Sequence, residues 1–179
     1  MALLRGINVG GNNLVDMRRL KATFERLGLE NVRTYINSGN VLFDTKRRGR
    51  PQLTKAIAVG ITEDFGVDVG VLLRTADELR ALVDAIPAKW TNDTTMKCDV
   101  YFLWPAIDRA KVVDEVPRNP AIEDLRYLPG ALVRRIDNDQ RTKSPMTKIV
   151  GTPIYKQMTA RNINTVRKLA ALAAADASR

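Results

Sequence analysis

The sequence predicts an α+β protein of two successive units, the second an incomplete copy of the first, with a C-terminal helix. Three observations predict this class. Short apolar runs alternate with stretches of helical periodicity, the first half has the order βαββαβ, and a similar order begins again after residue 87. The 179 residues, 45% of them hydrophobic, suffice for one domain or two small ones that share a core.

The spacing of apolar residues gives the elements of the first half. Strands are expected at residues 2–5, 31–37, 40–44 and 69–73, and helices over residues 14–27 and 53–65. Asp16 is placed to cap the first helix, Gly28 follows its end, and Ser38-Gly39 is a tight hairpin signal. The order βαββαβ is that of the ferredoxin-like fold, or α/β plait.

The second half repeats this plan less completely. A linker helix over residues 75–86 ends at Pro87, so the predicted domains are residues 1–87 and 88–179. A strand at 100–104, a short helix at 107–113, strands at 125–128 and 132–136, and a closing helix at 164–175 are expected. Residues 146–158 have a partly helical pattern, and no last strand is evident. The second unit is therefore predicted to be an imperfect duplicate.

Composition excludes several chemistries. The chain has no histidine and a single cysteine, Cys98, so it has neither an internal disulfide nor an imidazole base, and no metal or cofactor is predicted. Apolar runs are too short to span a bilayer and the N-terminus lacks signal-peptide features, which predicts a cytoplasmic protein without a membrane partner. Carboxylates, Arg, Lys, Tyr or backbone groups would have to carry any catalysis.

A glycine-rich turn, residues 5–13 (RGINVGGNN), and the hairpin at residues 37–40 are the candidate ligand site. Strands one and two of a βαββαβ unit run in the same direction, so these two segments should be neighbours. Strand alternation places Arg5, Tyr35, Asn37 and Asn40 on the face opposite the helices. The candidate ligand-binding residues are Arg5, Asn8, Gly10, Gly11, Asn12, Tyr35, Asn37, Ser38, Asn40, Arg161 and Asn162. The same residues can instead serve turns and helix caps.

Three motifs carry a family resemblance. Residues 5–11 (RGINVGG), 34–41 (TYINSGNV) and 159–165 (TARNINT) together resemble the signatures of the bacterial DUF1697 family. They span almost the whole chain. The resemblance implies a tandem of ferredoxin-like units and no assigned activity.

The formal net charge of +9 favours an anionic partner, although arginine-rich solvated surfaces give the same charge. The leading hypothesis is a basic anion-binding protein with nucleic acid as partner, through Arg134, Arg135, Arg141, Lys143 and Lys148. Against base-specific readout, Leu3 and Leu42 occupy the positions where RNA-binding plaits present aromatic side chains.

Two alternatives remain open. By analogy with acylphosphatase, another ferredoxin-like protein, the chain could be an enzyme or binder of a small phosphate or acyl phosphate. Arg5 would then bind the anion, Gly10 and Gly11 would donate N–H groups, and Asn40 would orient water. The other alternative is a non-catalytic scaffold that forms homo-oligomers through exposed edge strands.

Overall fold

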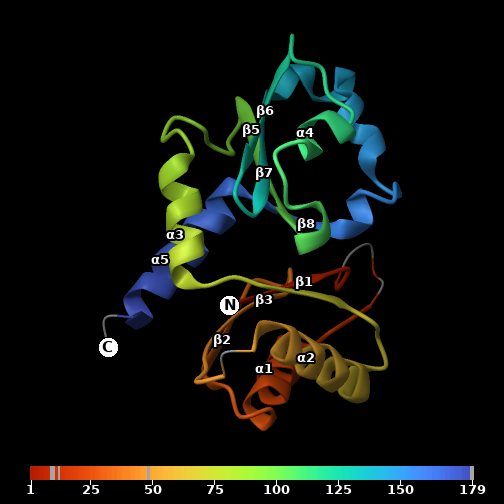
Figure 1. Ribbon diagram of the computed structural model, residues 1–179. Coiled ribbons are helices and arrows are strands. Elements are labelled where there is room, and N and C mark those ends of the chain that lie inside the picture. Colours follow the sequence, from red (N-terminus) through yellow and green to blue (C-terminus); the bar gives the residue numbers. More distant parts are fainter. Residues whose placement is uncertain (9–10, 12, 48, 178–179) are drawn as a thin grey trace. The chain divides into compact units, whose positions relative to one another are not determined.

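The chain folds as two compact units, Met1–Thr75 and Ala76–Arg179, each with its own four-stranded antiparallel sheet (Figure 1). The structure is a computed structural model and describes residues 1–8, 11, 13–47 and 49–177. The division lies before the linker helix, whereas the sequence suggested a boundary after Pro87. The linker helix packs against the C-terminal helix of the second unit.

The first unit is the predicted βαββαβ plait. Its elements are β1 (Ala2–Arg5), α1 (Met17–Arg26), β2 (Glu30–Tyr35), β3 (Asn40–Asp44), α2 (Arg50–Phe65) and β4 (Gly70–Leu73). The sheet order is β2-β3-β1-β4 with antiparallel neighbours. Both helices cover one face, where Leu4, Phe24, Val41 and Ile57 are fully buried in a common core. Apolar periodicity therefore predicted this unit element by element.

Local signals set the ends of α1. The Asp16 carboxylate caps the helix by accepting a hydrogen bond from the Arg19 backbone N–H at 2.8 Å. Gly28, just past the end, has φ +76°, a conformation that favours glycine. Leu14 was expected within the apolar stripe of this helix, but it precedes the helix and is 74% exposed.

Strand alternation divides the side chains of the first sheet as predicted. Val41 belongs to the core beneath the helices, whereas Leu3 and Leu42 lie on the opposite face. In register, Asn40 stands opposite both Leu3 and Tyr35. Leu3 and Leu42 are aliphatic and buried, whereas a base-stacking RNA-binding plait requires exposed aromatic side chains at these positions.

The second unit has the same strand order as the first. It contains α3 (Ala76–Ala85), β5 (Met96–Leu103), α4 (Val112–Glu115), β6 (Glu123–Leu128), β7 (Ala131–Asp137), β8 (Met158–Asn162) and α5 (Ile163–Ala177). Four short 3-10 helices accompany them: η1 (Pro105–Ile107), η2 (Asn138–Lys143), η3 (Pro145–Ile149) and η4 (Tyr155–Gln157). The sheet order is β6-β7-β5-β8.

The expectation that the last strand is missing was wrong. Strand β8 pairs with β5 over its whole length, from Met158 opposite Leu103 to Asn162 opposite Asp99. The sequence does not predict β8, because Arg161 and Asn162 interrupt the apolar alternation that is typical of a strand. The duplication is imperfect in another respect, since 3-10 helices replace the α-helix that should connect β7 to β8.

The two faces of the second sheet are covered differently. Helices α3 and α5 lie on one side of the sheet, and α4 with the 3-10 segments lies on the other (Figure 1). Tyr101, Leu103 and Leu132 point to the second side, where they form a core with Met146 and Ile149. On that side, the regular sheet is therefore covered by short and irregular helical segments.

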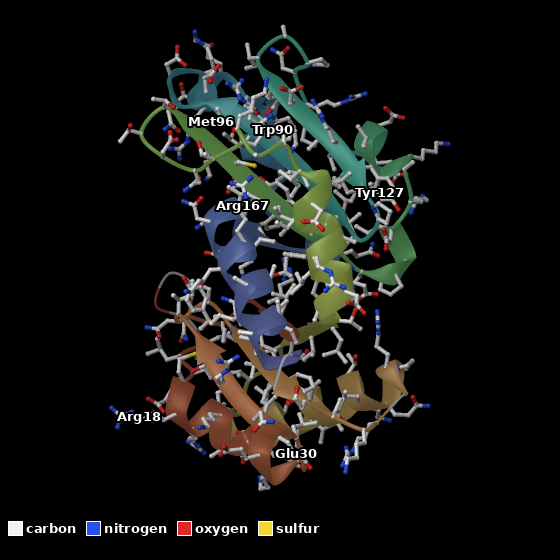
Figure 2. The ribbon with its side chains drawn as sticks, turned by 90° about the vertical axis from the view of Figure 1, so that its left-hand side faces the viewer. Arg18, Glu30, Trp90, Met96, Tyr127 and Arg167 are labelled. Atoms are coloured by element: carbon white, nitrogen blue, oxygen red, sulfur yellow. The ribbon has the colours of Figure 1, made fainter. Side chains whose placement is uncertain are left out.

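The segment between α3 and β5, residues 86–95, is held to the rest of the second unit by polar and aromatic contacts. Arg167 on α5 donates a hydrogen bond from Nη2 to the Pro87 carbonyl oxygen at 3.2 Å, and Figure 2 shows its place on that helix. Trp90 is buried, and the Arg126 guanidinium lies 4.6 Å from the centre of its ring. Among the described residues, no helix has the length and apolarity needed to cross a membrane.

Candidate functional site

The glycine-rich turn and the hairpin after β2 lie against each other, as the topology predicted. The Leu4 backbone N–H donates to the Gly39 carbonyl oxygen at 2.8 Å. The Asn8 side chain donates from Nδ2 to the Asn37 carbonyl oxygen at 3.0 Å. The two motifs of the first unit therefore form one joined structure.

Asn8 is the residue that joins them. Its Nδ2 also donates to the Val15 carbonyl oxygen at 3.0 Å, while its Oδ1 accepts from the Val15 N–H at 2.8 Å. Both N–H groups of the Asn8 amide are thus used within the protein. The backbone of Asn8 adopts φ +52°, a left-handed conformation that asparagine tolerates better than most residues. These contacts account for Asn8 structurally.

The start of α1 offers little to an external anion. The Asp16 carboxylate already sits at the N-terminal N–H groups and balances the partial positive charge of the helix there. Gly11 is exposed with φ +80°, and the predicted ligand-binding residues Gly10 and Asn12 lie outside the described residues.

The hairpin residues have packing and hydrogen-bonding roles. A Cβ atom on Gly39 would lie 2.7 Å from the Leu4 Cβ atom, so only glycine fits. Asn40 is fully buried and donates from Nδ2 to the Tyr35 carbonyl oxygen at 3.1 Å. The remaining predicted residues of this group are half-buried or exposed: Arg5 and Tyr35 are half-buried, and Asn37 and Ser38 are exposed.

Arg161 and Asn162 hold the end of β8 and the start of α5. Arg161 is buried, which lowers the pKa of its guanidinium to about 10, and its Nη1 donates to the Ala160 carbonyl oxygen at 2.7 Å. The Asn162 Oδ1 accepts from the Thr165 N–H at 2.8 Å. Asn162 therefore caps the helix, one of the two roles the sequence allowed.

The basic residues proposed for nucleic acid do not share one surface. Arg134 and Arg135 are consecutive in β7, so they point to opposite faces of the sheet, and Arg135 pairs with Asp137. Arg134 is only 6% exposed. The other three are exposed on the 3-10 segments: Arg141 and Lys143 on η2, and Lys148 on η3.

Arg134 and Arg141 instead line a pocket of about 580 Å³ in the second unit. Strands β5, β7 and β8 supply its floor, and the 3-10 segments supply its cover. Its lining residues are Lys97, Asp99, Tyr101, Arg134, Asn138, Arg141, Thr142, Met146, Thr147, Ile149, Val150, Tyr155 and Ala160. This volume is typical of sites for small molecules.

Arg134 is the polar centre of this pocket. Its Nε donates to Glu123 Oε2 at 2.6 Å, and the Ser144 hydroxyl donates to the same oxygen at 2.7 Å. Burial raises the pKa of Glu123, but hydrogen bonds from the Asn119 N–H, Ser144 and Arg134 outweigh burial and hold the pKa below its ordinary value. The carboxylate therefore stays charged and fixes the guanidinium. The Nη2 atom of Arg134 is buried and has no hydrogen-bond partner.

An unpaired guanidinium N–H group in a buried setting carries a desolvation penalty that a ligand acceptor would remove. Asp99, 13% exposed, stands directly opposite Arg134 on β5 and pairs with Lys97, whose Nζ lies 3.3 Å from Asp99 Oδ2. Burial, and after it the nearby Asp99 carboxylate, raise the pKa of the Tyr101 phenol and outweigh Arg134, whose charge and hydrogen bond to the phenol lower it. Tyr101 is thus a neutral hydroxyl at the pocket floor.

The sequence analysis missed Lys97, Asp99 and Tyr101. They alternate with apolar residues in β5, which is a detectable sign of one polar strand face. Their meeting with Arg134 required the register between β5 and β7, which the sequence does not reveal. Within the described residues, no cluster of three or more metal-ligating side chains occurs, and Cys98 is buried as a free thiol.

Comparisons with known proteins agree with the fold. A conserved bacterial protein from Streptococcus pneumoniae, SP0830, has a solved structure similar to this one, with a TM-score of 0.78, 27% identity and 96% of each chain covered. No curated protein matches the chain in sequence. The family model described as a protein of unknown function (DUF1697) matches residues 1–133. The chain therefore belongs to the DUF1697 family.

Proposed function

We propose that the protein binds a small organic anion in the pocket of the second unit, with Arg134 as its main donor. The observation that carries this proposal is the buried Nη2 atom of Arg134, which lacks a partner in a residue that lines the pocket. A carboxylate or phosphate oxygen placed there would satisfy that donor. Charge-assisted hydrogen bonds of this kind are among the stronger polar interactions in proteins.

The charge around the pocket supports a ligand that carries an anionic group. Three cations, Lys97, Arg134 and Arg141, are accompanied by two carboxylates, Asp99 and Glu123, which leaves an excess of one positive charge. A bound monoanion would neutralise this excess. Exposed Thr142 and Thr147 add hydroxyl groups at the mouth.

Nucleic acid is the second candidate. The net charge of +9 and the exposed side chains of Arg141, Lys143 and Lys148 on neighbouring 3-10 helices favour it. The burial of Arg134 and its separation from Arg135 weigh against it, because a phosphate backbone contacts protruding side chains. We therefore rank the small anion first.

The test compares Arg134→Lys with Arg135→Lys. Lysine at 134 keeps a positive charge beside Glu123 but removes the second nitrogen of the fork, whereas position 135 is on the other face of the same strand. Acetate, citrate, inorganic phosphate and AMP are titrated against each variant by calorimetry and thermal melting. A ligand at 100 times its Kd should stabilise the protein by about 2.7 kcal/mol.

We expect at least one of these anions to bind the natural protein and the Arg135→Lys variant equally, with affinity reduced about tenfold or more by Arg134→Lys. Anion binding that Arg134→Lys leaves unchanged would overturn the proposal. Binding of mixed-sequence RNA that falls steeply with salt and ignores Arg134→Lys would favour the second candidate instead.

A further inference from the structure

We infer that the pocket ligand is a zwitterion, an α-amino acid with an apolar side chain, whose carboxylate binds Arg134 and whose ammonium binds Asp99. The inference rests on the proposed function, because the ligand binds Arg134 through its carboxylate group, and it adds a positive group to that ligand. It is carried by the paired placement of one guanidinium and one carboxylate on the pocket floor.

The two groups are brought together by strand register. Asp99 on β5 and Arg134 on β7 are directly opposite each other and line the same pocket. Cβ atoms of such cross-strand pairs lie about 4.5–5.5 Å apart. Despite this, Arg134 forms its ion pair with Glu123, and Asp99 forms its ion pair with Lys97. A positive and a negative group thus stand side by side, each held by a different partner.

A positive and a negative group at adjacent positions can bind the two charges of an α-amino acid, which are separated by a single carbon. The planar fork of arginine matches a carboxylate, and a carboxylate with 13% exposure can accept from an ammonium. Lys97 is the competitor for Asp99, but its side chain is 34% exposed and can turn to solvent. The ligand ammonium would then take its place.

Net charge argues against a phosphate monoester. The pocket has an excess of one positive charge, which a dianion would reverse. When Lys97 turns to solvent and the ligand ammonium takes its place at Asp99, Arg134 and Arg141 balance Asp99 and Glu123, and a zwitterion keeps that balance. The backbone N–H groups of a long helix N-terminus, which commonly bind phosphate, are not part of this pocket, because its cover consists of 3-10 helices of three to six residues.

Part of the pocket cover is apolar. Met146 and Ile149 from η3 are almost fully buried, and Val150 follows them toward the solvent. Ala160 on β8 adds a small side chain to the floor. A volume of about 580 Å³ leaves room beyond the charged groups for a side chain such as that of leucine, methionine or phenylalanine.

The test measures how much each charged group of the ligand contributes to its affinity. Calorimetry is run with leucine, methionine and phenylalanine, with 4-methylpentanoate, which is leucine without its ammonium, and with 3-methylbutylamine, which lacks the carboxylate. We expect one of the amino acids to bind about tenfold or more tightly than either half-ligand, because each charged hydrogen bond adds affinity. Inorganic phosphate serves as the comparison anion.

Two variants give changes of opposite sign. Asp99→Asn should weaken amino-acid binding about tenfold and leave 4-methylpentanoate no weaker. Lys97→Met removes the competitor, so amino-acid binding should strengthen while 4-methylpentanoate binding weakens. Asp124→Asn, an exposed carboxylate on β6, is the matched control and should change neither. If Asp99→Asn fails to fold, the opposite changes expected for the two ligands in Lys97→Met still test the inference.

The outcomes distinguish this inference from the proposed function. If 4-methylpentanoate or phosphate binds as tightly as the amino acids and Arg134→Lys abolishes that binding, the zwitterion inference is overturned and the anion site stands. If no carboxylate or phosphate binds, both are overturned. If the amino acids bind more tightly than the half-ligands, and this binding weakens in Asp99→Asn and strengthens in Lys97→Met, both are supported.

Discussion

The two units have the same strand order but differ in the connection between their third and fourth strands. In the first unit this connection is α2, a continuous helix of 16 residues that buries Leu53, Ile57 and Ile61 against the sheet. In the second unit it is a series of 3-10 helices and turns that includes Pro145 in η3 and Pro153 in the turn before η4. A regular helix fills the face of a sheet, whereas short 3-10 turns do not pack as evenly.

The sheet faces beneath these two connections also differ, in the polarity of their side chains. The face under α1 and α2 is apolar, with Leu4 and Val41 at its centre. The equivalent face of the second sheet carries Asp99 and Arg134 beside an apolar cluster. Where the helix is lost, the sheet below it accommodates charged groups and a pocket. Under the proposed function, the first copy of the plait is a packed unit and the second carries the ligand site.

The largest expected effect tests the buried charge of the second unit. Glu123→Gln leaves the Arg134 guanidinium without its buried counter-ion, so we expect a loss of roughly 3–5 kcal/mol in the free energy of unfolding. Trp90 and Trp104 both lie in the second unit, so urea denaturation followed by tryptophan fluorescence reports on it.

Asp124→Asn is the control for this substitution, because the Asp124 carboxylate is exposed and its pairing with Arg126 is loose at 3.9 Å. It should change stability by less than about 0.5 kcal/mol. Equal effects of the two substitutions would show that the buried pair has no special role.

A second test enlarges a small side chain in each unit and compares the loss of stability. Gly39→Ala in the first unit should lose roughly 2–4 kcal/mol, because the new Cβ atom meets Leu4 and the backbone has φ +71°. Gly66→Ala, at φ +68° with no atom within 4 Å of the new Cβ, isolates the backbone part at about 1–2 kcal/mol.

Ala160→Val is the counterpart in the second unit, since Ala160 faces the pocket and valine favours strands. It should change the free energy of unfolding by no more than about 0.5 kcal/mol. A large loss from Ala160→Val would contradict the contrast between a filled and a hollow face. Circular dichroism during urea denaturation measures all three variants.

The smallest effect is a dependence of the second unit's stability on alkaline pH. Burial, and after it the Asp99 carboxylate, raise the pKa of the Cys98 thiol from 9.0 to about 12. The unfolded chain therefore releases this proton at lower pH than the folded one. Stability from this group is fully present below pH 9 and falls as the pH rises toward 12.

At pH 10 the loss from Cys98 should be about 1.4 kcal/mol relative to pH 8. Cys98→Val removes the titrating group and should flatten the profile by that amount. The measurement is urea denaturation by tryptophan fluorescence at both pH values. A profile of the same slope in the valine variant would show that other groups are responsible.

Much of the first unit could be predicted from the sequence because its signals are local. Apolar spacing located both helices, and β3 has the predicted bounds. Strand alternation placed Leu3 and Leu42 opposite the helices, and topology brought Asn8 to the hairpin. What could not be predicted was the structural role of Asn8, because its partners Val15 and Asn37 are set by the folded backbone.

The second unit was harder to predict because its distinctive features are not local. Strand β8 has a polar sequence that becomes a strand only by pairing with β5. Arg134 and Arg135 look equivalent in the sequence, and only their opposite directions in β7 separate a buried pocket residue from a surface ion pair.

The sequence by itself determined the family, the repeated plait, the basic charge and the absence of histidine chemistry. These follow from composition, periodicity and motifs, which do not depend on distant contacts. Only the tertiary structure decided that Asp99 and Arg134 stand opposite each other over a pocket. Their meeting depends on a register between strands about 35 residues apart in sequence and on a connection too irregular to fill the space above them. Such pairings arise from the packing of the whole unit, and no single segment encodes them.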